Sequence, residues 1–488
     1  MAKLSNSKSK RSRKKTPALP PTPRPTLRAG CSRAELLKSF LALIKPDLAR
    51  WLPVPVPTAG KRGPYERLFV PLIVLWYFVY GHLQDRWSLD KAMEDARTGG
   101  ADALSPKGKR LSRKLKSDST SALAQARERL PLATLLQALA HGAKAVRAWM
   151  VEPVWRGRHV ILLDGSTLRM RPFGDIPQVF KPHGSGNARR RYWCLMRVVV
   201  GFCLQTAVVC GHAMGAISVS EQALACQILL QAAPASLFLG DRNFGIFRIV
   251  QAAHHAQAHL LVRLTHVRAR KLAGGRMLRS GLDLPVLWAP SRHDRLEPGV
   301  PAEPVAGRLI VLRIKRPRTR AFLLCLFTTL TDAPAFPAAE LVALYGVRWH
   351  AELNLRYLKT EMALATLPGK SADIVQKEWV AGLIAYNLIR AVMVAAATKT
   401  GMSVYDLSFR AAQVSLQKFV DKSLDDPSRI RRAWRVMLAR IRARHLPKRR
   451  KARPAEPRAK RPFGEAVPTL YGSRAAARRK MRKSPAKS

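Results

Sequence analysis

Acidic residues are scarce in this chain of 488 residues. Asp and Glu together number 31 against 86 Lys and Arg, which leaves a formal net charge of +55 at pH 7. A surface that is charged only for solubility does not need to exclude one sign so strongly. The imbalance therefore predicts a polyanionic partner, most commonly nucleic acid. The hydrophobic content of 47% predicts a folded chain of about two to four domains.

Cysteines are few, and several common metal and nucleotide motifs are missing. The six thiols form no CxxC pair, which argues against a secreted disulfide framework and favours a cytoplasmic, nucleoid-associated protein; they are Cys31, Cys194, Cys203, Cys210, Cys226 and Cys325. No GxxxxGK[ST] loop supports ATP dependence. His254, His255 and His259 include a pair at zinc-like spacing but no third ligand, so we interpret them as ordinary histidines.

Long apolar runs are also rare, and we expect no membrane partner. Residues 68–80 are too short to span a bilayer, and residues 379–397 carry Asn387 and Arg390, which favours a buried helix. No apolar signal segment is expected at the start of the chain. Residues 1–29 instead contain nine basic residues, no acids and "PALPPTPRP", a composition typical of a disordered cationic arm.

Composition and periodicity divide the chain into five expected parts. Ser32-x-x-Glu35 has the form of a capping box and predicts the start of the first helix. The helices up to residue 150 and their basic loops predict a DNA-binding domain, although a plain helical scaffold with solvated lysines has the same pattern. The expected parts are a basic disordered arm (1–30), a helical DNA-binding domain (31–150), a catalytic domain (151–400, with a β-rich insertion at 268–332), a helical segment (401–440) and a basic disordered tail (441–488).

The pattern changes to alternating strands and helices after His159. "HVILLDGST", "RYWCLMRVVVGFC" and "QTAVVCGHAMG" read as three strands, and they are followed by helix, strand, helix and strand up to "HLLVRLTH". This order predicts an α/β domain with a mixed sheet.

Two acids end predicted strands and a third lies on a predicted helix. Asp164 ends the first strand and Asp241 the fourth, and sites in open α/β sheets gather at the carboxyl ends of strands. Glu352 lies on a helix predicted for 337–362, which would pack across that edge. Singly, these acids are typical of a turn, a helix cap and a solvated helix face. Together they predict carboxylate ligands for two Mg²⁺ or Mn²⁺ ions, which could promote an in-line phosphoryl displacement.

The same predicted helix carries a phenol and two basic groups beside the glutamate. Tyr345, Arg348, Glu352 and Lys359 fall within about 60° of one another at 100° per residue. This face would present a carboxylate to metal ions and basic groups to phosphates.

These residues resemble a known family. Tyr345-x2-Arg348-x3-Glu352-x6-Lys359 matches, without a gap, the Tyr-Arg-Glu-Lys signature of bacterial insertion-sequence transposases of the insertion sequence four type. "LLDGSTLRM" and "LFLGDRNFG" resemble the two aspartate motifs of that family. The resemblance extends over about residues 60–397 and includes "KSDSTSALAQARERL" and "LIAYNLIRAV".

The resemblance implies a ribonuclease H-like fold with a β-rich insertion before the helix that bears the catalytic glutamate. It implies that Asp164, Asp241 and Glu352 are catalytic metal ligands. Tyr345, Arg348 and Lys359 would then hold the phosphates of the transposon end. Members of the family act as synaptic dimers on inverted repeats of double-stranded DNA, cleave the end through a hairpin and join the 3′-end to target DNA.

Hairpin formation often involves a flipped base that stacks on an aromatic ring. We hypothesise that Trp288, in the insertion, provides this platform, with Trp349 as a second candidate; an ordinary core or surface tryptophan is the alternative for Trp288. Two other functions stay open. One is a nuclease of the same fold without strand transfer, and the other is a non-catalytic DNA-binding protein such as a degenerate transposase or a repressor.

Overall fold

The computed structural model describes most of the chain between residues 24 and 446. The described residues are 24–48, 51–52, 68–84, 87–105, 110–151, 155–182, 193–295, 303–314, 321–398, 400–423 and 428–446, with 475, 476 and 479. Most of the predicted basic arm and most of the predicted basic tail lie outside this set. The chain forms two compact units. The features below belong to the first unit, residues 1–314 and 322–445.

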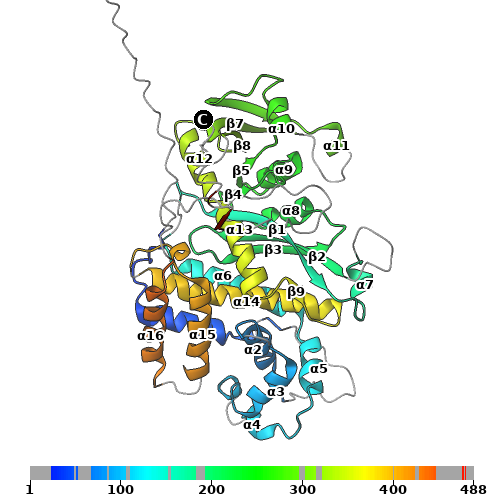
Figure 1. Cartoon of the computed structure of the whole chain (residues 1–488), viewed down its shortest axis with the longest axis vertical. Coiled ribbons are helices and arrows are strands. Elements are labelled where there is room, and N and C mark those ends of the chain that lie inside the picture. Colours follow the sequence, from blue (N-terminus) through cyan, green and yellow to red (C-terminus); the bar gives the residue numbers. More distant parts are fainter. Residues whose placement is uncertain are drawn as a thin grey trace, which may run out of the picture. The chain divides into compact units, whose positions relative to one another are not determined.

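A mixed sheet of nine strands forms the centre of this unit (Figure 1). Its order is β3-β2-β1-β4-β5-β8-β7-β6, and the short β9 also pairs with β1. β2 is antiparallel to β1 and β3, whereas β4 and β5 run parallel to β1, which confirms the predicted mixed sheet. The strands are β1 (Val160–Met170), β2 (Cys194–Cys203), β3 (Val209–Ala216), β4 (Leu237–Gly240), β5 (His259–Arg263), β6 (Leu282–Trp288), β7 (Val305–Ile314), β8 (Phe322–Thr328) and β9 (Thr366–Leu367).

The segment expected as an insertion lengthens the same sheet. β8 pairs antiparallel with β5, and β7 and β6 follow outward from it. Two short helices, α10 (His266–Leu272) and α11 (Arg292–Arg295), lie between these strands along the chain.

Helices cover both faces of the sheet, and the residues of β1 and β4 alternate between the two cores. Leu163 and Phe238 belong to the core beneath α8 (Glu221–Leu230) and α9 (Phe247–His255). Leu162 and Leu239 belong to the opposite core, with α6 (Leu132–Ala148) and α14 (Ala372–Ala397). Figure 1 shows α8 and α9 on one side of β1 and α14 on the other.

The N-terminal helices share their core with the sheet instead of forming a separate unit. α1 (Arg33–Ile44) begins at the predicted capping box between Ser32 and Glu35. It is followed by α2 (Pro71–Gly81), α3 (Leu89–Arg97), η2 (Asp102–Leu104), α4 (Leu111–Lys114), α5 (Ser121–Arg129) and, after β1, α7 (Ile176–Val179). The side chains of α1, α2 and α6 join one apolar cluster with α14.

α14 is the central helix of that cluster. By length and composition alone it could cross a membrane, but every residue of its most apolar window is buried inside the structure. Its position agrees with the buried helix expected over 379–397. η5 (Val404–Asp406), α15 (Phe409–Ser423) and α16 (Ile430–Ala443) follow it.

The single helix predicted for 337–362 is wrong in detail. The segment contains α12 (Ala338–Gly346), α13 (Trp349–Arg356) and a π-helical turn, η4 (Tyr357–Glu361). Between α12 and α13 the backbone N–H groups of Val347 and Arg348 bond to carbonyls three residues earlier, which tightens the turn. The even 100° spacing used for prediction therefore does not hold from Tyr345 to Lys359.

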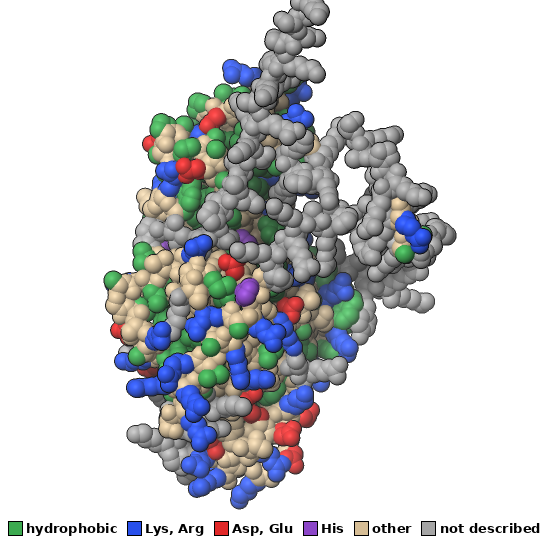
Figure 2. Space-filling view, turned by 60° about the vertical axis from the view of Figure 1, so that its left-hand side comes forward, with side chains coloured by type: hydrophobic (Ala, Val, Ile, Leu, Met, Phe, Trp, Pro, Cys, Tyr) green, Lys and Arg blue, Asp and Glu red, His purple; other side chains and the backbone are tan. Residues whose placement is uncertain are grey.

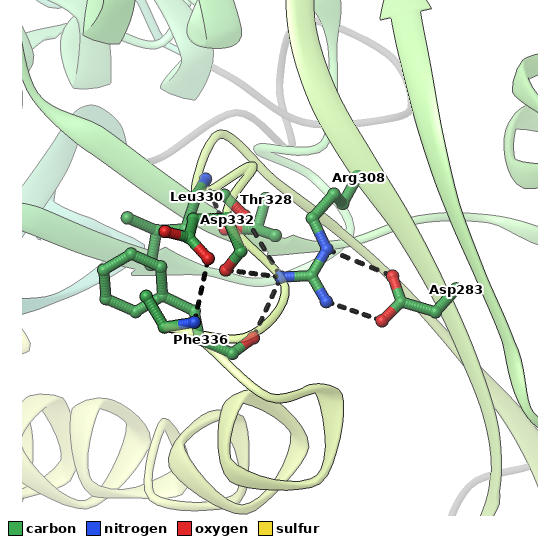
Figure 3. Close-up of polar contacts among 7 residues, drawn as sticks. Asp283, Arg308, Thr328, Leu330, Asp332 and Phe336 are labelled. Atoms are coloured by element: carbon green, nitrogen blue, oxygen red, sulfur yellow. Dashed lines mark hydrogen bonds and ion pairs between the residues drawn. The ribbon is translucent and has the colours of Figure 1, made fainter.

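A buried arginine fixes the loop that leads into α12. Arg308, on β7, is 2% exposed. Its Nε and Nη2 atoms donate to the two carboxylate oxygens of Asp283 on β6, at 3.1 and 2.5 Å. Its Nη1 atom donates to the carbonyls of Leu330, Asp332 and Phe336, at 3.3, 3.4 and 2.9 Å (Figure 3). One side chain thus holds the chain between β8 and α12 against the outer strands.

Replacing Arg308 with methionine is expected to lower the free energy of unfolding by about 3 kcal/mol, because it leaves Asp283 without its cation and removes the guanidinium donor from three carbonyls. Arg313→Met is the matched control, since Arg313 is exposed on the same strand and should change stability by less than about 0.5 kcal/mol. Urea unfolding of the two variants measures the difference. Equal midpoints would show that Arg308 does not hold the loop.

Candidate active site

The pairing of β4 with β1 brings the two aspartates together. The register of these strands pairs Val160 with Leu237 and Leu162 with Leu239. If this register is continued by two residues, Asp164 lies beside Asp241. Neighbouring strands in a sheet are about 4.8 Å apart. Each of these acids therefore has the other as its neighbour across the sheet.

Both aspartates face the side of the sheet that α13 covers. Because side chains alternate along a strand, Asp164 shares a face with Leu162 and Leu168, which lie in the core that also contains Ala351 and Leu355 of α13. Glu352 lies between those two helix residues along the chain. The charges of Asp241 and Glu352 both act on Asp164, so the structure brings the three predicted acids into electrostatic range.

Asp164 does not end its strand as predicted. β1 continues to Met170, paired residue by residue with β2, whereas β4 ends at Gly240. The edge of β1 next to β4 thus lacks a strand partner from Leu163 to Leu168 among the pairings of the described residues, and β9 pairs only with the last two residues of β1. The site occupies this unpaired stretch of the strand edge.

Burial is the main influence on the Asp164 carboxyl. The pKa of Asp164 is raised to about 6, mainly by burial and to a smaller extent by the charges of Asp241 and Glu352. Arg348 opposes this shift, as does the Gly165 N–H, which donates to Asp164 Oδ1 at 3.0 Å. A partly buried carboxylate whose charge is poorly balanced is a favourable position for a cation.

Glu352 is paired with Arg348 one turn earlier on the chain. Arg348 Nη2 donates to Glu352 Oε1, and the side chains are 14% and 42% exposed. Burial alone would lower the pKa of Arg348, but Tyr345, Glu352 and Asp164 together raise it. Burial also raises the pKa of Tyr345 to about 12, although Arg348 acts to lower it. Tyr345, Arg348 and Glu352 therefore form one cluster beside Asp164.

Lys359 reaches the same face of β1 from the π-helical turn. Its Nζ atom donates to Ser166 Oγ at 3.0 Å, two residues beyond Asp164 on the strand. Ser166 was not among the residues predicted from the sequence. It stands two positions after Asp164, and residues two apart on a strand share one face.

Arg263 is a second residue that the sequence reasoning missed. The β4–β5 register pairs Gly240 with Val262, so one further step sets Arg263 beside Asp241. Its charge acts on Tyr345, and its guanidinium lies 5.6 Å from the ring centroid of Phe322. The rule that selected Asp164 and Asp241, that of residues at the carboxyl ends of parallel strands, would also have selected Arg263.

The loop after Asp241 is held by polar contacts from the other face of the sheet. The Asn243 N–H donates to Asp241 Oδ1 at 2.8 Å. The Asn243 side chain donates to Glu221 and accepts from Gln222, both at the start of α8. A Cβ at Gly165 would lie 2.7 Å from the Glu221 carboxyl carbon. The backbone next to each aspartate is thus packed against the same end of α8.

The two tryptophans considered as stacking platforms differ in exposure. Trp288 is 6% exposed and packs edge-to-face on Phe327, with centroids 4.7 Å apart. It offers no open ring face to a base in this arrangement. Trp349, next to Arg348, is 56% exposed.

The donor set suits a hard divalent cation, although no complete ligand group is preformed. Among the described residues there is no group of three or more His, Cys, Asp or Glu side chains set to hold a metal ion, and Glu352 is paired with Arg348. Asp164 and Asp241 supply adjacent carboxylate oxygens, the ligands that Mg²⁺ and Mn²⁺ prefer. Glu352 would complete the set after release from Arg348.

Comparisons with known proteins find similarity to transposases. Residues 155–388 match a family model described as "Transposase DDE domain". The transposase InsG for insertion sequence element IS4, from Escherichia coli strain K12, is 27% identical over 277 residues, which cover 56% of this chain and 61% of that protein. The match thus spans about three fifths of the length of this curated relative. A cryo-EM structure of the piggyBac transposase synaptic complex with hairpin DNA aligns with a TM-score of 0.42 and 11% identity, over 88% of this chain and 89% of the other.

Replacing Asp164 with asparagine should stabilise the metal-free protein at pH 8. The folded-state pKa of about 6 lies above the ordinary 3.8, so the native state loses stability as the pH rises between about 4 and 6. Asp164→Asn removes this loss and should raise the free energy of unfolding by at most about 3 kcal/mol at pH 8, with no gain at pH 4 or below.

Denaturant unfolding in chelator at the two pH values measures this effect. Asp90→Asn, at an exposed position of α3, is the control and should show little change at either pH. A gain for Asp164→Asn that is the same at both pH values would contradict the assigned pKa.

Proposed function

We propose that the protein is a DNA transposase, because residues 155–388 match the model of the transposase DDE domain. Its reaction would cleave DNA at the terminal inverted repeats of an insertion sequence and join the 3′-ends to target DNA. The observation that carries the proposal is the register of β1 and β4, which sets Asp164 beside Asp241 on the face that Glu352 approaches.

The sheet topology supports a ribonuclease H-like core for this domain. Three antiparallel strands, β1 to β3, are followed by two strands, β4 and β5, that continue the sheet parallel to β1. The chain order of strands and helices is that expected for this fold, and β6, β7 and β8 occupy the place of the expected insertion.

The carboxylates of Asp164, Asp241 and Glu352 would hold two Mg²⁺ or Mn²⁺ ions. Such ions, when bound, activate the attacking oxygen and stabilise the leaving one. The task of the protein is to hold the carboxylates ionised and the phosphate in line. Because burial raises the pKa of Asp164 to about 6, protonation of this residue should weaken metal binding below that pH.

The basic residues of the cluster would bind the phosphates around the scissile bond. Arg348 is paired with Glu352, and a DNA phosphate is an alternative partner for the guanidinium. Binding of DNA would then free Glu352 to act as a ligand. Lys359, held at Ser166, and Tyr345 lie on the same side, and Arg263 adds a further cation near Asp241.

A hairpin step would need an exposed ring to receive a flipped base. The exposure of Trp349 favours it over Trp288 for this role. Trp288 would have to leave its contact with Phe327 first. We also propose that the protein works as a homodimer on paired transposon ends, since two ends must be joined together.

Replacing Glu352 with glutamine is expected to lower the rate of Mg²⁺-dependent nicking at the transposon end by more than about 100-fold, because an amide is a poor Mg²⁺ ligand. The substrate is a duplex that carries the inverted repeat of the element, with and without chelator. Glu361→Gln, in the π-helical turn, is the matched control and should retain activity. Binding of the duplex in chelator should be no weaker for Glu352→Gln than for the wild type and Glu361→Gln, because loss of the Glu352 charge leaves Arg348 available to a phosphate.

The products distinguish the alternative functions. Nicked DNA whose 3′-end is joined to a second duplex supports a transposase. Nicking without joined product supports a nuclease of the same fold. Binding without nicking, for the wild type as for Glu352→Gln, would contradict the proposal and identify a non-catalytic DNA-binding protein.

A further inference from the structure

The last described helix, α16 (Ile430–Ala443), has one face anchored in the core. Trp434, Met437, Leu438 and Ile441 are each at most 3% exposed. The Trp434 ring lies 5.0 Å from that of Phe40 on α1, and 5.7 Å from that of Phe419 on α15. The orientation of the helix is therefore fixed by aromatic packing.

The other face of α16 is lined with arginines. Arg431, Arg432, Arg435 and Arg440 are exposed, and residues 428–446 contain no acid. Within the part of the chain that the structure describes, none of these four side chains forms an ion pair. Figure 2, turned so that the side of α15 and α16 comes forward, shows many Lys and Arg side chains over the lower half of the molecule.

This arrangement is unfavourable for an isolated helix. Arg431 and Arg432 lie in the first turn, where the helix dipole favours acids. Arg431 and Arg435 are four residues apart, a spacing at which like charges repel. Local conflicts of this kind concentrate at functional sites, where a ligand offsets them. A ligand that offsets this one must be strongly anionic.

We propose that the arginine face of α16 binds the phosphate backbone of duplex DNA, independently of base sequence. From Arg431 to Arg440 the helix advances about 13.5 Å, a length over which duplex DNA carries about eight charges. Val436, 42% exposed, is the one large apolar side chain on this face among the described residues of α16, which does not favour an apolar protein partner. The inference rests on the proposed function only in taking DNA as the partner. It does not require that the protein is catalytically active.

The test is the salt dependence of DNA binding by a triple variant, Arg431→Gln, Arg432→Gln and Arg435→Gln. The probe is a duplex without the inverted repeat, in chelator, at several salt concentrations. Each lost phosphate contact should reduce the slope of log K against log salt by about 0.9, so the triple variant should lose about two to three units of slope and bind at least tenfold more weakly near 0.1 M salt. A single Arg432→Gln variant should lose about one unit.

The matched control replaces three exposed arginines elsewhere, Arg276, Arg279 and Arg313, with glutamine. It removes the same charge and should leave the slope nearly unchanged. Without DNA, the melting temperature of the α16 variant should equal or exceed that of the wild type, because repulsion within the helix is relieved. This shows that weaker binding does not come from unfolding.

Two results would overturn the inference. One is an equal loss of slope in the α16 variant and in the control, which would mean that net charge alone governs binding. The other is an unchanged DNA slope with loss of binding to vesicles of anionic phospholipid, which would assign the face to a membrane surface. Because chelator prevents cleavage, neither result depends on whether the protein is a nuclease.

Discussion

The parallel pairing of β1 with β4 is the constraint on which the site depends. β4 contributes four residues, Leu237–Gly240, and then ends, while β1 continues against β2. This difference in length leaves one edge of β1 open at the level of Asp164 and puts Asp241 directly beside it. A shift of one residue would turn one aspartate to the other face of the sheet. The buried leucines of the two strands therefore fix the chemistry as well as the core.

The second determinant is the balance of acidic and basic side chains at the site, in a chain that has few acids. Asp164 is partly buried and near two other carboxylates, which raises its pKa, whereas Glu352 is neutralised by Arg348. In this arrangement the basic side chains of the protein lie where metal ions and phosphates would bind. The same logic applies to α16, because residues 428–446 contain many arginines and no acid. Both surfaces are incomplete without a charged partner.

Much of this account could be predicted from local sequence. Apolar runs marked β1, β2 and β4, and the capping box marked the start of α1. The three acids could be selected because two followed apolar runs and one lay on a predicted helix with basic neighbours. These signals are local, so they do not depend on how the chain folds back on itself.

The features that could not be predicted depend on tertiary contacts. The extension of β1 to Met170 follows from its pairing with β2, and the tightened turn before α13 separates Tyr345 from the regular spacing of its neighbours. The burial of Trp288 depends on Phe327, which lies 39 positions later in the sequence. Arg308 looked like one more basic residue of a basic chain, and only the fold gives it Asp283 and three carbonyls as partners.

The most direct test of the central claim is to locate the metal by cleavage of the polypeptide itself. Fe²⁺ in place of Mg²⁺, with ascorbate and peroxide, generates radicals that cut the backbone near the bound ion. The account predicts cuts close to Asp164 and Asp241 that excess Mg²⁺ suppresses and that are absent from an Asp164→Asn, Asp241→Asn double variant. Cuts elsewhere in the chain, or cuts that persist in the double variant, would contradict the assignment of these two aspartates to one metal site.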